Sequence, residues 1–180
     1  ESAYFTCFNR RKESIVLDIK SPRDRELLER LLDNSDVLVE NFRPGVMDRL
    51  GLGFEELKKD NSKLIYCAIS GFGQDGPMKK LPAYDQIIQG MSGVMSITGN
   101  QETAPYRVGY PLCDTIGGMT AAFAIAASLA NPNRTEGQFI DVSMLESTLA
   151  TMGWVVSNHL IGGIDPQPLG NDNFTSSPSG

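Results

Sequence analysis

The sequence predicts an α/β fold built on an open, doubly wound, mostly parallel sheet of the Rossmann-like kind. Strand-like and helix-like segments alternate along the chain, the strand-like segments are continuously apolar, and loops rich in turn residues follow them. Continuous apolar character is what burial on both faces of a parallel sheet requires. With 180 residues and 41% hydrophobic content, the chain is long enough for one sizeable core.

The first half of the chain is expected to alternate strand and helix from its start. Residues 14–19 form a short β-branched run typical of a strand. A helix should follow over residues 22–32, where leucines recur at helical spacing, with Ser21 as its N-cap and Pro22 at its first position. The remaining elements of this half are strands at 37–39 and 64–69 and a helix at 54–59.

The second half is expected to supply three helices and one strand. The helices are predicted over 84–95, 114–129 and 144–160, and the strand over 138–142. The glycine pair 162–163 should end the last helix. In the helix 114–129, the larger apolar residues share one face, which is the pattern of a helix packed on a core: Ile116, Met119, Phe123, Ala126 and Leu129.

Composition excludes several classes of function. A net charge of −6 and a pI near 4.8 argue against binding to nucleic acid or to an anionic membrane surface. Three cysteines at spacings that match no zinc pattern suggest neither disulfides nor a metal site. The most apolar stretch, 116–130, is shorter than the roughly 20 residues of a membrane span. A cytoplasmic protein is expected, or a mitochondrial matrix protein if the source is eukaryotic, and the chain reads as cut at both ends.

Asp114 is the strongest candidate for chemistry, because it opens an alanine-rich helix after a short extended stretch. Such a carboxylate commonly caps the first turn of its helix. Capping does not explain the following Gly117-Gly118, which weakens a helix. The alternative is a nucleophile that attacks a thioester carbonyl. Cys113 is a second possible nucleophile, although adjacent residues at such a turn point in opposite directions, which favours a packing role for it.

Other polar residues follow the predicted strands, where ligands sit in open α/β sheets. Asn41 is a turn residue or a ligand contact, and Arg49, with Arg43 nearby, is a solvated charge or a phosphate partner. The basic cluster 9–12, which includes Arg10 and Lys12, either is solvated or clamps a phosphorylated cofactor. Asp85, behind Tyr84, fits a first-turn carboxylate, and the lone His159 fits packing or C-terminal capping.

The order and the residue sequences of these motifs resemble those of the family III coenzyme A (CoA) transferases. This group contains the formyl-CoA, carnitine-CoA and dicarboxylate-CoA transferases. The resemblance runs through nearly all 180 residues. Its carriers are the segments 9–18, 39–45 with 48–51, 70–77, Tyr84-Asp85, Asp114 with Gly117-Gly118, and 137–141.

The resemblance implies a function and a set of site residues. Asp114 would carry the acyl group and then CoA, through anhydride and thioester intermediates. The residues at CoA-contacting positions of the family are Asn41, Arg49, Leu50 and Tyr84, with Arg10 and Lys12 near the phosphates. CoA enters as acyl-CoA substrate, the partner is a free carboxylic acid, and no metal is implied.

The resemblance also implies a larger protein than this chain. Residues 1–162 would be part of the CoA-binding catalytic domain, and 163–180 a loop leading toward a small domain that is missing here, as are the first strand and helix and a glycine-rich loop over the site. The full-length protein would be an interlocked homodimer. Full activity is therefore not expected from this segment alone.

Two other functions stay open. The related α-methylacyl-CoA racemase pairs its aspartate with a histidine of a His-Asp motif, where this chain has Tyr84-Asp85 and so lacks the imidazole needed for two-base proton transfer. A non-catalytic acyl-CoA-binding domain is the third possibility. The segment 107–114 looks most like dicarboxylate-type members, and Arg107 is either a solvated loop residue or a partner for a second carboxylate.

Overall fold

The computed structural model describes residues 2–172, and the chain forms two compact units, Glu1–Asn34 and Ser35–Gly180. The predicted loop 163–180 has no helix or strand over 163–172, and its last eight residues lie outside the described part. Each unit is considered by itself below.

The first unit contains two helices, α1 (Ala3–Phe8) and α2 (Pro22–Asp33). The predicted helix is confirmed, with Ser21 as N-cap residue and Pro22 in its first turn. The predicted strand 14–19 is wrong, because these residues join no ladder, and Ile15 and Val16 are 59% and 95% exposed. β-Branched residues favour a strand only where pairing and packing reward it.

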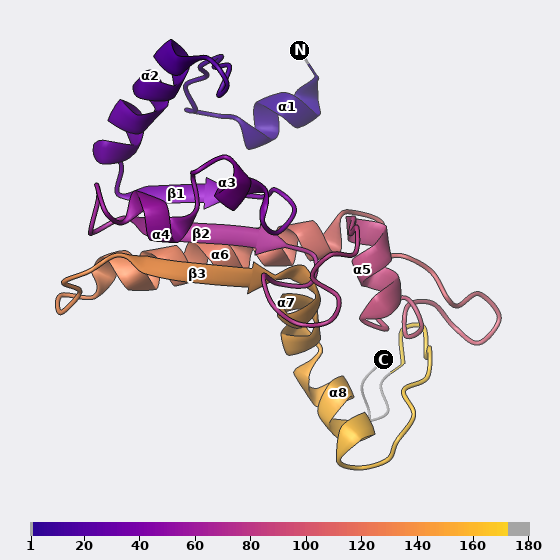
Figure 1. Cartoon of the computed structure of the whole chain (residues 1–180). Helices are drawn as coiled ribbons and strands as arrows, with labels where there is room; N and C mark the ends of the chain where they lie inside the picture. Colours follow the sequence, from indigo (N-terminus) through magenta and orange to yellow (C-terminus); the bar gives the residue numbers. More distant parts are fainter. Residues whose placement is uncertain (1, 173–180) are drawn as a thin grey trace. The chain divides into compact units, whose positions relative to one another are not determined.

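The second unit is built on a three-stranded parallel sheet in the order β1-β2-β3. The strands are β1 (Val37–Glu40), β2 (Ile65–Ser70) and β3 (Gln138–Ser143). In Figure 1 the three arrows point the same way, so their carboxyl ends share one edge of the sheet. The central strand is buried almost throughout, whereas β1 and β3 are partly exposed.

Helices cover both faces of this sheet, as a doubly wound fold requires. On one face α6 (Leu112–Ala130) packs through Ala121 against Cys67 and Val142. On the other, Phe54 of α4 (Phe54–Leu57) lies against the rings of Tyr66 and Phe139, with centroids 5.6–6.1 Å apart. The α/β fold class is confirmed.

The packed face of α6 is the opposite of the predicted one. Phe123 and Met119 are 78% and 69% exposed, while Gly117 and Ala121 face inward. Small residues let the helix approach closely, since a Cβ at Gly117 would lie 3.2 Å from Met144. With 19 residues α6 is also longer than the sequence suggested, and by length and apolar composition alone it could cross a membrane. Core helices of soluble proteins pass the same test, and α6 packs on β2 and β3.

Four further helices lie in the described part of this unit. They are α3 (Val46–Arg49), α5 (Asp85–Met91), α7 (Met144–Thr151) and α8 (Gly153–Leu160). The single helix predicted over 144–160 is interrupted at Met152, just before Gly153.

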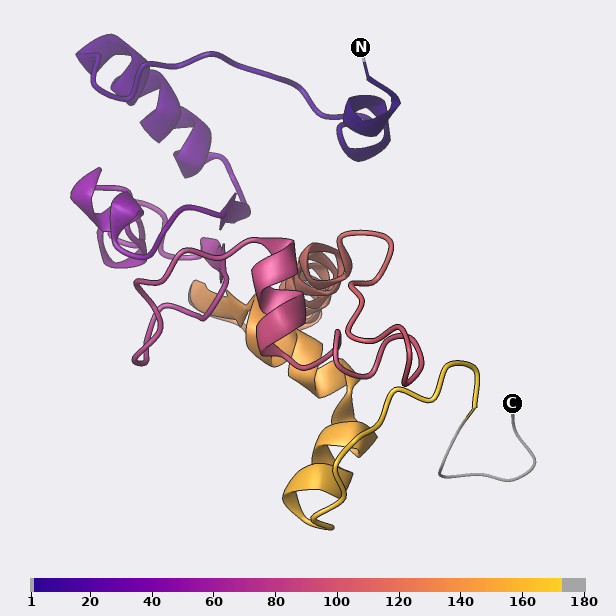
Figure 2. The same ribbon diagram turned by 90° about the vertical axis from the view of Figure 1, so that its right-hand side faces the viewer.

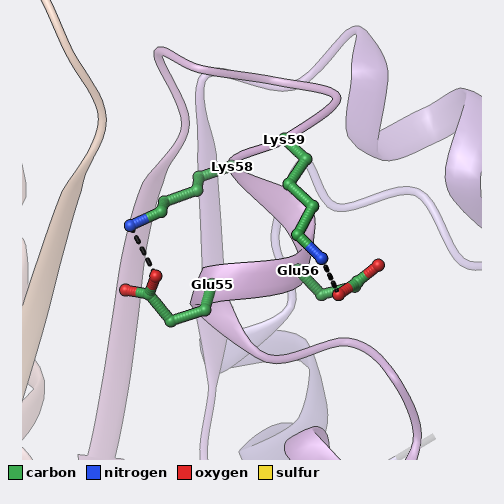
Figure 3. A network of polar contacts seen from close by, with 4 residues as sticks. All are labelled: Glu55, Glu56, Lys58 and Lys59. Carbon is green, nitrogen blue, oxygen red and sulfur yellow. Dashed lines mark hydrogen bonds and ion pairs between the residues drawn. The ribbon is translucent and has the colours of Figure 1, made fainter.

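The short helix α4 carries a solvated charged face. Figure 3 shows its two ion pairs, Glu55 with Lys58 and Glu56 with Lys59. Exposed pairs of this kind contribute little to stability.

Candidate active site

A cavity of about 320 Å³ opens at the carboxyl edge of the sheet. Loops after β1 and β2, the first turns of α5 and α6, and the start of α7 form its wall, and Figure 2 shows α5, α6 and α7 gathered at this end. The polar residues of the wall are Asn41, Arg43, Ser70, Lys79, Tyr84, Asp85 and Asp114. Loops that were far apart in the sequence therefore meet where open α/β sheets bind ligands.

Asp114 lines this cavity from the first turn of α6. It is the third residue of the helix and is exposed. In the described part of the chain, no donor bonds its carboxylate oxygens, so the side chain does not cap its own helix. Both oxygens remain free to contact a bound molecule.

The capping role belongs to Asp85, a residue of the neighbouring helix α5 that is 6% exposed. Its Oδ1 accepts hydrogen bonds from the backbone N–H groups of Cys113 at 2.7 Å and Asp114 at 3.2 Å. Its Oδ2 accepts from Gln89 Nε2 at 2.6 Å, and Gln89 Oε1 in turn accepts from Val108 N–H at 2.8 Å. A buried carboxylate thus ties α5, the 106–111 loop and the start of α6 together.

The protonation of Asp114 reflects this environment. Partial desolvation of its carboxyl group at the cavity wall, first, and the negative charge of Asp85, second, raise the pKa of Asp114 above its ordinary value. Donors that would lower it are absent from the described residues. A carboxylate without hydrogen bonds is more basic and more nucleophilic than a capped one.

We expect Asp114 to titrate at a higher pH than an ordinary aspartate, whose pKa is about 3.9. Because the folded pKa is raised, the carboxylate is lost as the pH falls through this higher value, and so is any reaction that needs it. A ¹³C-NMR titration of aspartate-labelled protein measures it, with Asp114→Asn identifying the signal. A signal that titrates at or below the ordinary value would contradict the expectation.

Cys113 is unsuited to be the nucleophile. Its side chain is fully buried against Ile88 and Met144. Burial raises the pKa of the Cys113 thiol, so it stays protonated at neutral pH. The turn therefore presents Asp114 to the cavity and Cys113 to the core.

Comparison with known proteins places this arrangement in a family. The family model of CoA-transferase family III matches residues 1–180. This chain belongs to CoA-transferase family III. The recognition made from the motifs is confirmed.

Curated CoA-transferases and a solved structure are similar to this chain over most of its length. The chain is 47% identical to an acetyl-CoA:oxalate CoA-transferase from Acetobacter aceti over 173 residues, which is 95% of this chain and 44% of the relative. It is 42% identical to a succinate–glutarate CoA-transferase from Agrobacterium fabrum over 98% of this chain and 44% of the relative.

A crystal structure of a CaiB/BaiF family protein from Brucella suis matches with a TM-score of 0.91 and 38% identity. The match covers 98% of this chain and 47% of that one. The chain therefore spans about half the length of the relatives it matches.

The structure brings some of the residues expected to contact CoA to the cavity that Asp114 lines. Asn41 and Tyr84 line it together with Asp114. Asn41 is held in place because its Nδ2 donates to the Ile69 carbonyl at 2.7 Å, which leaves its side-chain oxygen available. Tyr84 is 70% exposed and is the N-cap residue of α5.

Arg49 and Leu50 do not line the cavity. In the sequence they come shortly after the loop 41–44, which does line it. Arg49 is the last residue of α3, and its guanidinium lies close to Gly45, where a Cβ would be 3.5 Å from Nη1. Gly45 has φ of +79°, a conformation that favours glycine. Arg49 is exposed and lies next to the loop that carries Asn41.

Four basic residues named in the sequence analysis, Arg10, Lys12, Arg107 and His159, do not line the cavity. Arg10 and Lys12 are exposed residues of the first unit, so their proximity to CoA phosphates stays a prediction. Arg107 is exposed and is not part of the cavity wall. His159, on α8, is exposed and lies 3.2 Å from Asp165.

Sequence reasoning missed three polar residues of the cavity wall. Lys79 was not considered, Ser70 was placed in a motif without a role, and Asp85 was read as a first-turn charge of its own helix. The segment 70–77 was a usable signal, because it follows the central strand and leads to Lys79. Among the described residues, no group of three or more His, Cys, Asp or Glu side chains is arranged to hold a metal ion.

Proposed function

We propose that the full-length protein moves CoA between an acyl-CoA thioester and a free carboxylic acid, with Asp114 as the nucleophile. The observation that carries this proposal is the free carboxylate of Asp114 in the cavity, next to a helix end that another carboxylate caps. No structural role accounts for a carboxylate that makes no hydrogen bond among the described residues. Contact with a bound thioester does account for it.

The proposed reaction balances without ATP or another co-reactant. The Asp114 carboxylate attacks the thioester carbonyl, the C–S bond breaks, and CoA leaves as a thiolate from the mixed anhydride. The thiolate then attacks the Asp114 carbonyl and expels the first acid, which leaves CoA in thioester linkage to Asp114. The acceptor carboxylate reverses these two steps, so that Asp114 returns to its free form and a new acyl-CoA departs.

This function is tested on the full-length protein with labelled acyl-CoA and a panel of free acids. Formation of a second acyl-CoA that depends on the added acid supports it, and sizing of the active species tests the homodimer that we propose as the working unit. Exchange of the α-proton with deuterated water in the absence of an acceptor would instead support a racemase. Tight acyl-CoA binding without turnover would support a binding domain.

We further propose that the acceptor acid is a dicarboxylate. The relatives named above are CoA-transferases of oxalate, succinate and glutarate. In this chain two cations, Arg43 and Lys79, line the same cavity as Asp114. One carboxylate of such an acid would reach Asp114 and the other would pair with a cation.

Replacing Lys79 with Met is expected to raise the KM of a dicarboxylate acceptor about tenfold, the effect of losing one charge-assisted hydrogen bond. The KM of a monocarboxylate of equal chain length should not change, because it has no second anion. Lys79 also lies 3.6 Å from the exposed Asp75, so the side chain is only loosely held.

Lys80→Met is the matched control, since Lys80 is exposed and does not line the cavity. Steady-state kinetics with both acids and with acyl-CoA give the answer. Equal effects of Lys79→Met on the two acids would contradict the assignment, and an effect on acyl-CoA alone would assign Lys79 to CoA.

A further inference from the structure

Ser70 is a buried side chain of the cavity wall whose hydroxyl has no partner. It is the last residue of the central strand β2 and is 6% exposed. Among the described residues, nothing hydrogen-bonds its Oγ. It lines the same cavity as Asp114.

A buried hydroxyl without a partner is unfavourable, because it has given up its hydrogen bonds to water and gained none in the protein. Its neighbour in the sheet shows the usual solution: Ser143, paired in register with Ser70, uses its Oγ to accept from Glu146 N–H at 3.2 Å and caps α7. Ser70 has no such structural use. Its buried hydroxyl is an unused donor and acceptor of a residue that lines the cavity.

The reaction proposed above needs a donor at this place, because negative charge develops on the carbonyl oxygen when Asp114 attacks. The helix start beside Asp114 does not supply one, because its first N–H groups are already bonded. Cys113 and Asp114 donate to Asp85, Leu112 donates to the Tyr110 carbonyl at 2.8 Å, and Thr115 donates to the Pro111 carbonyl at 3.0 Å.

The glycines after Asp114 do not supply a donor either. Gly117 and Gly118 lie inside α6, where backbone N–H groups bond to the preceding turn of the helix. Gly117 is also buried against Met144. Close packing accounts for Gly117, whereas a Cβ at Gly118 would meet nothing within 4 Å.

We propose that the Ser70 hydroxyl donates a hydrogen bond to the acyl carbonyl oxygen of the bound thioester and stabilises the oxyanion formed when Asp114 attacks. The proposal rests on the proposed function and adds a substrate-contacting residue to it. The side chain is preorganised, because β2 is the central strand and is paired on both sides. A donor fixed in this way needs no rearrangement as charge develops.

Ser70→Ala in the full-length protein is expected to lower kcat/KM for exchange about 100-fold, as loss of one oxyanion donor does. Its Tm should be unchanged or higher, because an unpartnered hydroxyl has been removed from the interior. The control is Ser128→Ala: Ser128 is 7% exposed and its Oγ bonds Gln138 near the far end of α6. This control should lose stability and keep its kcat/KM.

A spectroscopic readout tests the contact without turnover. Asp114→Asn protein is mixed with acyl-CoA labelled with ¹³C at the thioester carbonyl, and the infrared carbonyl band is compared with that of the Asp114→Asn/Ser70→Ala protein. A hydrogen bond from Ser70 lowers the stretching frequency, so removing the hydroxyl should shift the band to higher frequency.

An unshifted band overturns the proposal, as does a Ser70→Ala protein with kcat/KM within twofold of the wild type. A loss of Tm as large as that of Ser128→Ala also overturns it, since the hydroxyl would then have a structural partner. Failure of the proposed function looks different: the wild-type protein forms no second acyl-CoA, or Asp114→Asn retains exchange. The infrared comparison still decides the role of Ser70 in that case.

Discussion

Asp114→Asn is expected to lower the rate of CoA exchange by roughly 10⁴-fold or more, the usual effect of removing a nucleophile. Asparagine matches aspartate in size, but its amide cannot form an anhydride with the acyl group. Affinity for free CoA should remain, because the other lining residues are untouched. The Tm should not fall, since no hydrogen bond in the described residues depends on this carboxylate and the repulsion with Asp85 disappears.

Hydroxylamine trapping followed by peptide mass spectrometry identifies the acylated residue in the wild-type protein. We expect a hydroxamate on Asp114, formed only in the presence of acyl-CoA. Asp114→Ala guards against deamidation of the asparagine variant, and Asp165→Asn, at an exposed carboxylate near α8, is the matched control. A label on Cys113, or full exchange by Asp114→Ala, would refute the assignment.

Asp85→Ala is expected to reduce the free energy of unfolding by about 3 kcal/mol, because it leaves several donors without an acceptor at a buried site. These donors are the N–H groups of Cys113 and Asp114 and the Nε2 of Gln89. Exchange should also fall, by about 100-fold, since the turn that presents Asp114 loses its anchor. Denaturant unfolding and steady-state kinetics measure the two effects.

Asp85→Asn separates the positioning role of Asp85 from simple stability. The amide oxygen still accepts from α6, but the negative charge that raises the pKa of Asp114 is gone. The NMR signal of Asp114 should therefore titrate at lower pH than in the wild type. Gln86→Ala, at an exposed neighbour, is the control. An unchanged titration together with wild-type stability would show that Asp85 does not act on Asp114.

Much of the fold could be predicted because its signals are local. Apolar runs predict the strands found at 37–40 and 65–70, and the N-cap and proline predict the start of the helix at Pro22. The strand predicted at 14–19 is wrong because strand formation does not depend on local sequence alone. A strand also needs a partner, and β-branched residues such as Val16 carry no information about one.

Only those residues of the candidate site that the order of strands and helices places at the edge of the sheet could be predicted. Asn41 follows a strand, and Tyr84 and Asp114 stand at helix starts, so the rule for parallel sheets places them at one edge. Lys79 and Asp85 were not assigned because their use depends on neighbours from other loops. Asp85 and Cys113 are 28 residues apart, and no pattern between them indicates that one caps the other.

By itself, the sequence determined the family, the alternation of strand and helix, and Asp114 as the residue to test. Only the tertiary structure decided that Asp114 is free, because a residue from another helix takes over its capping bonds. It also decided which face of α6 is packed, and that the hydroxyl of Ser70 is buried without a partner. The physical reason is the same in each case: hydrogen-bond satisfaction and close packing are relations between segments distant in the chain, and only the folded arrangement specifies them.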